Sequence, residues 1–335
     1  MKKPGILFTG NTKEFYSLCK SRFNYLFNFV FLKELDFYSF SKELYSVDYV
    51  ISHALPDELQ DSLRNILCCE IFFVSSFDEL LPILSSLQIS RKPAGASSPG
   101  KKISSWDNYL RKVRLACQKD TTVLLLGETG SGKGFTARFI HDHSSRKNNP
   151  FKKKNLAEVN PNLVESEIFG TIRGAYTGCE EKTGLLGGTG NGTLFLDEIG
   201  ELSRDLQVKL YGVLDNKKYS RVGEFAEHEF RGRFFFATNE SIQKLIGEEK
   251  LKKEFFYRIN VFIIEVPPLR EHKRDIRSLA QEFALERRKI ISEEAIEKMM
   301  DYNWPGNIRQ LKNCIERGAV YSESDVIQDC DIEFF

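Results

Sequence analysis

The sequence lacks an apolar segment long enough to cross a membrane. A spanning helix needs about 20 consecutive apolar residues. The longest aromatic-rich stretch, residues 23–40, is interrupted by Asn, Lys, Glu and Asp. The basic start, MKKPGILFTGN, has an apolar run too short for a signal peptide and favours a first strand and turn. We therefore expect a cytoplasmic protein with no membrane partner.

The sequence also lacks a large net charge and any cysteine motif. Its formal charge is +1, so no global field draws it to nucleic acid or to a membrane. The seven cysteines have no metal-ligand spacing, and Cys68-Cys69 is an adjacent pair rather than a CxxC motif. We interpret them as reduced thiols in a cytosolic protein, acting as small buried hydrophobic residues.

Residues 1–90 have the pattern of a small α/β domain. Four short β-rich runs, GILFTG, NFVFL, DYVIS and EIFFVSS, alternate with segments whose apolar residues have helical spacing. The alternation predicts a parallel sheet and resembles a response-regulator receiver domain. Receivers carry an acidic pair after the first strand and a phosphoacceptor Asp after the third, where this chain has Thr9-Gly10-Asn11 and Ser52-His53. We expect a degenerate receiver that is not phosphorylated in the usual way, with a structural or exposed His53.

Two further segments read as connections. Residues 91–102, RKPAGASSPGKK, combine Pro, Gly, Ser and Ala with flanking cations and predict a flexible linker. The basic run Arg146–Asn155 is interpreted as a solvated connection, with DNA or a partner as alternatives to solvent.

The strongest motif is a phosphate-binding loop. An apolar run, Val123–Leu126, predicts a strand that enters the loop, and a helical pattern follows it. Glycines let successive backbone N–H groups point into one concavity, and the loop lysine reaches the outer phosphates. The general motif continues with Ser or Thr, whose hydroxyl meets Mg²⁺, but this chain has Gly134. The expected nucleotide-binding residues are Gly127, Glu128, Thr129, Gly130, Ser131, Gly132, Lys133 and Gly134.

Polar residues end two further apolar runs. Leu194–Leu196 predicts a buried strand that ends in Asp197-Glu198, and FFFAT is followed by Asn239. Ligands of open parallel sheets bind at the carboxyl ends of the strands. We expect Asp197 to hold magnesium and Glu198 to orient the attacking water. Asn239 holds that water, senses the γ-phosphate or is an ordinary turn residue.

Residues 103–320 resemble the AAA+ ATPase domain of bacterial enhancer-binding proteins, which activate sigma-54 RNA polymerase. The motifs that carry the resemblance are ESEIFG, GAYTGC, GTLFLDEIGELS, RVGE, ATN, YRINVF, PPLREHKRDI and NWPGNIRQLKN. It implies a P-loop parallel sheet at 103–270 and a small α-helical lid at 271–335, behind the receiver-like domain. It also implies ATP and magnesium as cofactors.

The resemblance gives GAYTGC a role. In the family the corresponding segment, typically GAFTGA, is a loop tip that grips sigma-54 in step with ATP turnover. Glycines permit a tight mobile turn, and the aromatic ring supplies contact area. A glycine-rich surface turn without a partner is the alternative. The expected partner-binding residues are Gly174, Ala175, Tyr176, Thr177, Gly178 and Cys179.

The family's other site residues are carried over by matching position. Lys133 and Asp197-Glu198 match the Walker elements, and Asn239 matches sensor I. Asn160 resembles the Asn that restrains the catalytic Glu, although the stretch before ESEIFG is about four residues shorter than usual. Arg309 matches sensor II, the cation that closes the lid over the nucleotide.

Two family arginines act on the neighbouring subunit's γ-phosphate. Arg258 matches the second, while the first position holds Lys252, which cannot make the planar two-pronged contact of Arg. The resemblance therefore implies a homo-oligomer, a hexameric ring or a dimer when inactive, with slow but assembly-dependent hydrolysis.

Family members usually end in a helix-turn-helix domain. The acidic end of this sequence, YSESDVIQDCDIEFF, does not predict one, so we expect no autonomous sequence-specific DNA binding. Three functions stay open. The chain is an ATP-hydrolysing activator that remodels the sigma-54 closed promoter complex, a nucleotide-binding regulatory or scaffold protein with little hydrolysis, or an AAA+ remodeller of another client.

Overall fold

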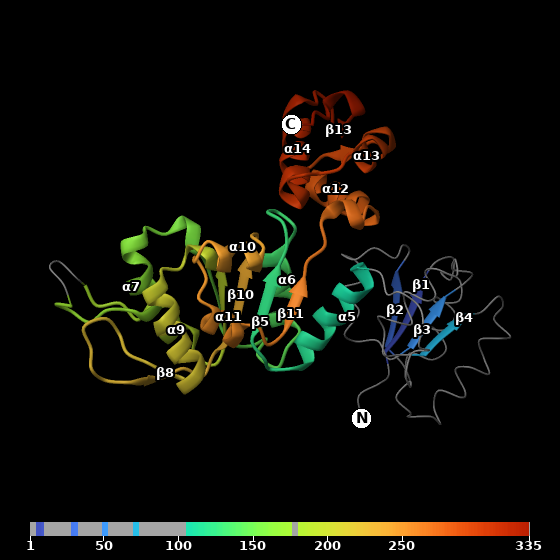
Figure 1. Cartoon of the computed structure of the whole chain (residues 1–335). Helices are drawn as coiled ribbons and strands as arrows, with labels where there is room; N and C mark the ends of the chain where they lie inside the picture. The colour runs from blue at the N-terminus through green and yellow to red at the C-terminus, as the bar shows by residue number, and fades with distance from the viewer. Residues whose placement is uncertain are drawn as a thin grey trace. The chain divides into compact units, whose positions relative to one another are not determined.

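The computed structural model describes residues 5–9, 28–32, 49–52, 70–73, 105–175 and 180–334. The chain divides into two compact units. Figure 1 labels the strands and helices of both. The first comprises residues 1–111, 269–303 and 311–335, and the second comprises residues 112–268 and 304–310.

The N-terminal part of the first unit is a four-stranded parallel sheet in the order β2-β1-β3-β4. Its strands are β1 (Gly5–Thr9), β2 (Asn28–Leu32), β3 (Tyr49–Ser52) and β4 (Glu70–Phe73). All four predicted strands and their parallel pairing are confirmed. The order is that of the first four strands of flavodoxin-like folds. Asn11, His53 and the linker at 91–102 lie outside the described residues.

The remaining elements of the first unit are mainly helical. The helices are α12 (Arg274–Glu286), α13 (Glu293–Met300) and most of α14 (Asn307–Tyr321), with a short pairing of β12 (Ile290–Ile291) and β13 (Val326–Ile327). Helix α13 begins at a serine cap, since the Ser292 hydroxyl accepts a hydrogen bond from the Ala295 N–H. Helix α5 (Ser105–Gln118) runs from the first unit into the second. No helix in the described part of the chain is long and apolar enough to cross a membrane.

The second unit is built on a five-stranded parallel sheet in the order β11-β5-β10-β7-β6. The strands are β5 (Val123–Leu126), β6 (Phe151–Asn155), β7 (Thr193–Asp197), β10 (Arg233–Thr238) and β11 (Ile263–Glu265). Strand β10 is buried along its whole length, as expected for a parallel strand covered on both faces. Helices α6 (Lys133–Asp142), α7 (Val164–Phe169), α8 (Gly184–Thr189), α9 (Arg204–Asn216), α10 (Ile242–Gly247) and α11 (Lys253–Ile259) connect the strands.

The basic run at 146–155 is partly a strand. Strand β6 includes its three consecutive lysines and forms the edge of the described sheet, so the expectation of a solvated connection is wrong for residues 151–155. The register pairs Lys153 with Phe195 and Asn155 with Asp197. The long apolar part of a lysine side chain can lie along a sheet while its charge reaches water. A strand made of lysines therefore lacks the apolar pattern by which strands are predicted.

The segment that leads into GAYTGC is closed by a short ladder. Thr171 exchanges two backbone hydrogen bonds with Lys182, each 2.9 Å long, and also pairs with Val222. Gly174 and Ala175 follow on one side, with Gly174 at a φ of 85°. Residues 176–179 lie outside the described residues. A two-residue antiparallel pairing of β8 (Lys218–Tyr219) with β9 (His228–Glu229) lies further along the chain.

Candidate nucleotide site

The glycine-rich loop joins the carboxyl end of β5 to the first turn of α6. Gly130 and Gly132 have φ values of 76° and 100°, at which a residue with a side chain would be strained. Lys133, only 6% exposed, turns back over the loop. Its ammonium donates to the carbonyl oxygens of Gly127 at 2.9 Å and Glu128 at 3.3 Å.

The loop fits a chain of phosphates. The Ser131 hydroxyl is buried and has no hydrogen-bond partner in the described part of the chain. Because a buried polar group without a partner costs about 1–3 kcal/mol, this hydroxyl favours an additional ligand. The Lys133 ammonium is the cation that such loops aim at outer phosphates.

The two acids meet the loop from β7. Asp197 ends the strand, and Glu198 follows it in the left-handed region with a φ of 57°. One Glu198 oxygen lies 3.9 Å from the Lys133 ammonium. The other accepts the Asn239 backbone N–H at 3.1 Å. The predicted loop, acidic strand end and third strand end therefore converge at one edge of the sheet.

Asn239 also binds the loop through its side chain. Its amide nitrogen donates to the Thr129 hydroxyl at 2.9 Å. The residue thus connects the loop to Glu198, which an isolated turn Asn would not do. This geometry favours the sensing interpretation over the turn interpretation.

Burial tunes the two opposite charges of the site. It raises the pKa of Glu198, while the Asn239 N–H and Lys133 act in the opposite direction. Burial lowers the pKa of Lys133, and the carboxylates of Glu198 and Asp197 oppose that change. Each charge therefore stabilises the other in a partly dehydrated site.

The segment at 304–310 packs on the same loop. Asn307, fully buried with a φ of 53°, donates to a Glu128 carboxylate oxygen and to the Thr129 carbonyl, both at 3.1 Å. The Ile308 N–H donates to the Gly130 carbonyl at 3.0 Å. A Cβ on Gly130 would lie 2.4 Å from the Gly306 carbonyl oxygen. Glycine at position 130 is thus required by contact as well as by φ.

This packing brings Arg309 to the site. A Cβ on Gly130 would lie 3.0 Å from the Arg309 Cβ. After burial, the charge of Arg309 also acts to lower the pKa of Lys133. Sequence reasoning found Arg309 but missed Asn307. The WPGN motif could have indicated Asn307. Its glycine allows two backbone segments to lie close together, and the neighbouring amide can then hydrogen-bond to the second segment.

The predicted Asn160 lies away from any strand end, whereas Asn155 lies at one. The exposed Asn160 caps a short turn, where its side-chain oxygen accepts the Asn162 N–H at 3.0 Å. Asn155, by contrast, ends β6 directly beside Asp197. Its side chain donates to Glu158 at 2.7 Å and accepts from the Ala157 N–H at 3.2 Å. The strand-end rule would have found Asn155 had β6 been recognised.

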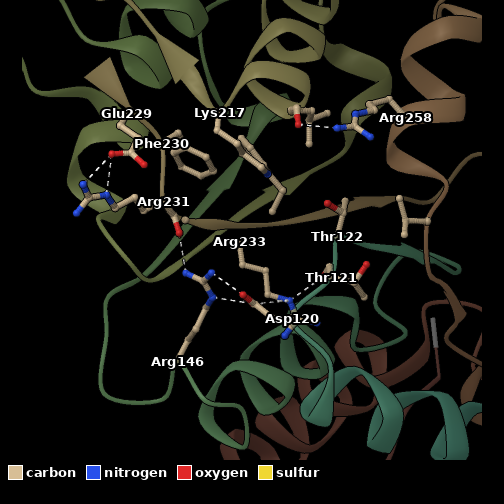
Figure 2. A pocket seen from close by; sticks show the side chains of 14 residues that line it. Asp120, Thr121, Thr122, Arg146, Lys217, Glu229, Phe230, Arg231, Arg233 and Arg258 are labelled. Atoms are coloured by element: carbon tan, nitrogen blue, oxygen red, sulfur yellow. Dashed lines mark hydrogen bonds and ion pairs between the residues drawn. The ribbon is translucent and has the colours of Figure 1, made fainter. Parts of the chain in front are cut away.

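Arg258 lies in a second region, at the other end of strand β5. Arg258 and the residues preceding β5 line a cleft of about 510 Å³. Figure 2 shows how the lining side chains lie. The Arg258 guanidinium donates to the Leu214 carbonyl at 2.8 Å and lies 3.2 Å from Asp215. Lining residues are Asp120, Thr121, Thr122, Arg146, Leu214, Lys217, Glu229, Phe230, Arg231, Gly232, Arg233, Phe234, Arg258 and Val261.

Five of these lining residues are cations and two are acids. Arg146 pairs with Asp120, and Arg231 pairs with Glu229, each at 2.7 Å. The buried Arg233 donates to backbone carbonyls, and burial lowers its pKa to about 10. The cleft therefore carries an excess of positive charge, and it lies at the end of β5 opposite the nucleotide loop.

Lys252 precedes the helix that carries Arg258. It is the N-cap of α11, and its backbone N–H donates to the Gln207 side chain at 2.8 Å. The structure therefore gives Lys252 a backbone role in starting the helix.

A charged network lies at the base of the GAYTGC segment. Arg221 binds Glu181 at 2.8 Å and Glu224 at 2.7 Å, and His228 binds Glu224 at 2.8 Å. These hydrogen bonds lower the pKa of Glu224 to about 2. The network ties the residues after the loop tip to the chain between β8 and β9.

The fold and this site define a nucleotide-binding P-loop domain of the AAA+ class. Residues 101–265 match the sigma-54 interaction domain, and residues 270–334 match the AAA+ ATPase lid domain. The chain belongs to the sigma-54 interaction family of AAA+ proteins.

Known proteins agree with this membership. The chain is 41% identical over 215 residues to the Nif-specific regulatory protein of Azospirillum lipoferum, covering 62% of this chain and 34% of that one. It is 34% identical over 290 residues to the alginate biosynthesis transcriptional regulatory protein AlgB of Pseudomonas aeruginosa, covering 84% and 63%. The chain thus spans less than two thirds of the length of these relatives.

The fold has a solved counterpart. NtrX from Brucella abortus, in crystal structures with ADP and with ATP, is 21% identical and superposes with a TM-score of 0.61. The match covers 99% of this chain and 84% of the NtrX chain. It confirms the fold class of a parallel α/β sheet with a C-terminal helical lid.

Proposed function

We propose that the protein hydrolyses ATP and uses the energy to remodel the sigma-54 RNA polymerase closed promoter complex. The observation that carries the proposal is the convergence of Lys133, Glu198 and Asn239 on one loop. A phosphate-binding cation, a carboxylate and an amide are the groups that phosphoryl transfer to water requires.

Each residue has a task in this proposal. Lys133 neutralises the outer phosphates, and Glu198 orients and polarises the attacking water. Asn239 holds Glu198 and the loop in one arrangement. Magnesium, held through Asp197, would offset negative charge on the phosphates. Arg309 joins the site from the segment at 304–310.

The position of Arg258 supports catalysis between subunits. It lies at the end of β5 opposite its own nucleotide loop, so a neighbouring copy is the site that it can serve. We infer a homo-oligomer, a hexameric ring by family, in which activity depends on assembly. The segment Gly174–Cys179 is the proposed contact with sigma-54, and we expect the complex in the cytoplasm.

The test compares ATP turnover of the wild-type chain with that of Glu198→Gln over a protein dilution series. We expect wild-type specific activity to rise with concentration and Glu198→Gln to bind ATP without turning it over. A flat dilution profile would contradict assembly-coupled catalysis. Equal turnover in the two proteins would contradict the role of Glu198.

The partner needs its own test. Purified sigma-54 should be retained by the wild-type protein with a transition-state mimic of ATP, and Thr177→Ala should lose that retention. Retention that does not depend on nucleotide or on Thr177 would favour a different client for the same ATPase.

A second candidate function is a nucleotide-binding regulator with little hydrolysis. Lys252 and Gly134 favour it, because each stands where the family or the general motif has a different side chain. Turnover of the wild type compared with Glu198→Gln distinguishes the two functions, and Lys252→Arg tests whether position 252 limits the rate. A rise in turnover supports a slow ATPase limited by position 252, and unchanged turnover shows that Lys252 does not limit the rate.

A further inference from the structure

The residue after the loop lysine is a glycine, and another cation lies where its side chain would be. A Cβ built on Gly134 would lie 2.8 Å from the Lys153 ammonium nitrogen. In the general motif this position carries the hydroxyl that meets Mg²⁺. The space next to the loop lysine is therefore occupied by an ammonium group from a different strand.

Lys153 reaches this place from the edge strand. It pairs in register with Phe195, and Asn155 pairs with Asp197, so alternation puts Lys153 on the same face of the sheet as Asp197. The ammonium has no hydrogen bond or ion pair to another described residue. Its nearest described aromatic partner is the Phe195 ring, whose centroid is 5.9 Å away.

The ring contact does not account for the placement. A distance of 5.9 Å is at the outer limit for a cation–π interaction, which is worth about 0.5–1 kcal/mol at an exposed site. Holding a lysine side chain in one rotamer costs more free energy, through lost side-chain entropy, than this cation–π interaction supplies. An anion beside Gly134 would supply the missing attraction.

We propose that Lys153 is a second phosphate-binding cation of the nucleotide site, standing in for the side chain that Gly134 lacks. This inference rests on the proposed function and deepens it. A positive charge beside the phosphates takes over part of the neutralisation that magnesium provides elsewhere. The protein therefore binds ATP with a weaker dependence on Mg²⁺ than a loop that carries Ser or Thr at position 134.

The experiment measures the affinity of the full chain for a fluorescent ATP analogue, once with excess Mg²⁺ and once with EDTA. The variants are Lys153→Met and its neighbour Lys152→Met, which is on the opposite face of the same strand. We expect Lys153→Met to weaken binding about tenfold in EDTA, the loss of one charge-assisted hydrogen bond, and less with Mg²⁺. Lys152→Met should match the wild type in both conditions.

Gly134→Ser tests the same idea from the other side. The new side chain would displace the flexible Lys153 ammonium and supply a hydroxyl for magnesium. We expect the ratio of affinity with Mg²⁺ to affinity in EDTA to rise severalfold. Lys153→Arg, which keeps a cation of similar reach, should keep binding in EDTA within about threefold of the wild type.

The outcomes separate this inference from the proposed function. If the wild type binds no ATP in either condition, the proposed function fails. If it binds ATP and Lys153→Met equals Lys152→Met in EDTA, only the role of Lys153 is overturned. A melting temperature for each variant identifies any that has unfolded, and Lys153→Arg then decides.

Discussion

The two ends of the five-stranded sheet differ in how well their positive and negative charges balance. At the carboxyl ends of the strands, charges of both signs face each other: Lys133 meets Glu198, and Asn239 connects both to the loop. At the amino ends, the cleft around Arg258 collects five cations and two acids. The first end is balanced within one chain, while the second carries unbalanced positive charge.

This difference separates two kinds of contribution to one reaction. A balanced site can bind and orient a ligand alone, since burial disfavours both charges and the attraction between Lys133 and Glu198 opposes that cost for each of them. An excess of cations around the partly exposed Arg258 side chain is suited to an anion that comes from outside. We therefore expect the carboxyl end to bind the nucleotide. The amino end would assist the site of a neighbouring subunit.

Arg258→Ala should have the largest effect of the substitutions considered for the two ends. We expect turnover to fall about 10³-fold, the contribution of an arginine finger, with ATP affinity unchanged. Arg204→Ala, which removes an exposed ion pair with Glu249, is the matched control and should leave turnover within twofold. Mixing Arg258→Ala with Glu198→Gln should restore part of the turnover. Lost affinity without rescue would place Arg258 in its own chain's site.

The tight contact of the nucleotide end is tested by two glycines with positive φ. Gly130→Ala adds a Cβ 2.4 Å from the Gly306 carbonyl, whereas Gly190→Ala adds one with no atom within 4 Å. Gly190→Ala should lose about 1–2 kcal/mol of unfolding free energy to the strain of a positive φ, and Gly130→Ala should lose more because of the added clash. Only Gly130→Ala should lose ATP affinity as well, by about tenfold or more. Equal affinity in the two variants would show that the segment at 304–310 does not shape the loop.

Substitutions of Asn155 and Asn160 test which of the two belongs to the nucleotide site. Asn155→Ala should lower turnover about fivefold, because it frees the turn that follows β6 beside Asp197. Asn160→Ala should cost about 0.5–1 kcal/mol of stability through the lost cap and change turnover less than twofold. Steady-state ATPase and thermal melting distinguish them, and the reverse ranking would return the role to Asn160.

The smallest expected effect concerns pH. The raised pKa of Glu198 means that the folded protein holds this proton more tightly than the unfolded chain. The charged carboxylate therefore costs stability as pH rises past the ordinary Glu value of about 4.3. Glu198→Gln should melt at the same temperature as the wild type near that value and slightly higher at neutral pH. A wild type that is the more stable at neutral pH would contradict the burial cost.

Much of the nucleotide end could be predicted from the sequence. Glycine spacing predicted the loop, and polar residues after apolar runs predicted Asp197, Glu198 and Asn239. These signals are local: the parallel sheet brings strand ends together whatever the rest of the chain does. The four N-terminal strands were predicted for the same reason, from β-rich runs between helical segments.

The missed residues depend on contacts between distant segments. Asn307 binds the loop from 179 positions further along the chain, and no local pattern reports such a contact. The lysines of strand β6 suggest a solvated segment, so the sequence does not indicate that Asn155 ends a strand beside Asp197. The position of the Lys153 ammonium beside Gly134 depends on how β6 and α6 pack, and the sequence alone does not indicate it.

The lysines of β6 also bear on solubility. Strand β6 is an outer strand of the described sheet, and such a strand offers unpaired backbone groups to other chains. Three adjacent ammonium groups discourage that pairing. Charge-removing substitutions in this strand are therefore best made singly, because removing all three would invite aggregation that mimics a loss of ligand.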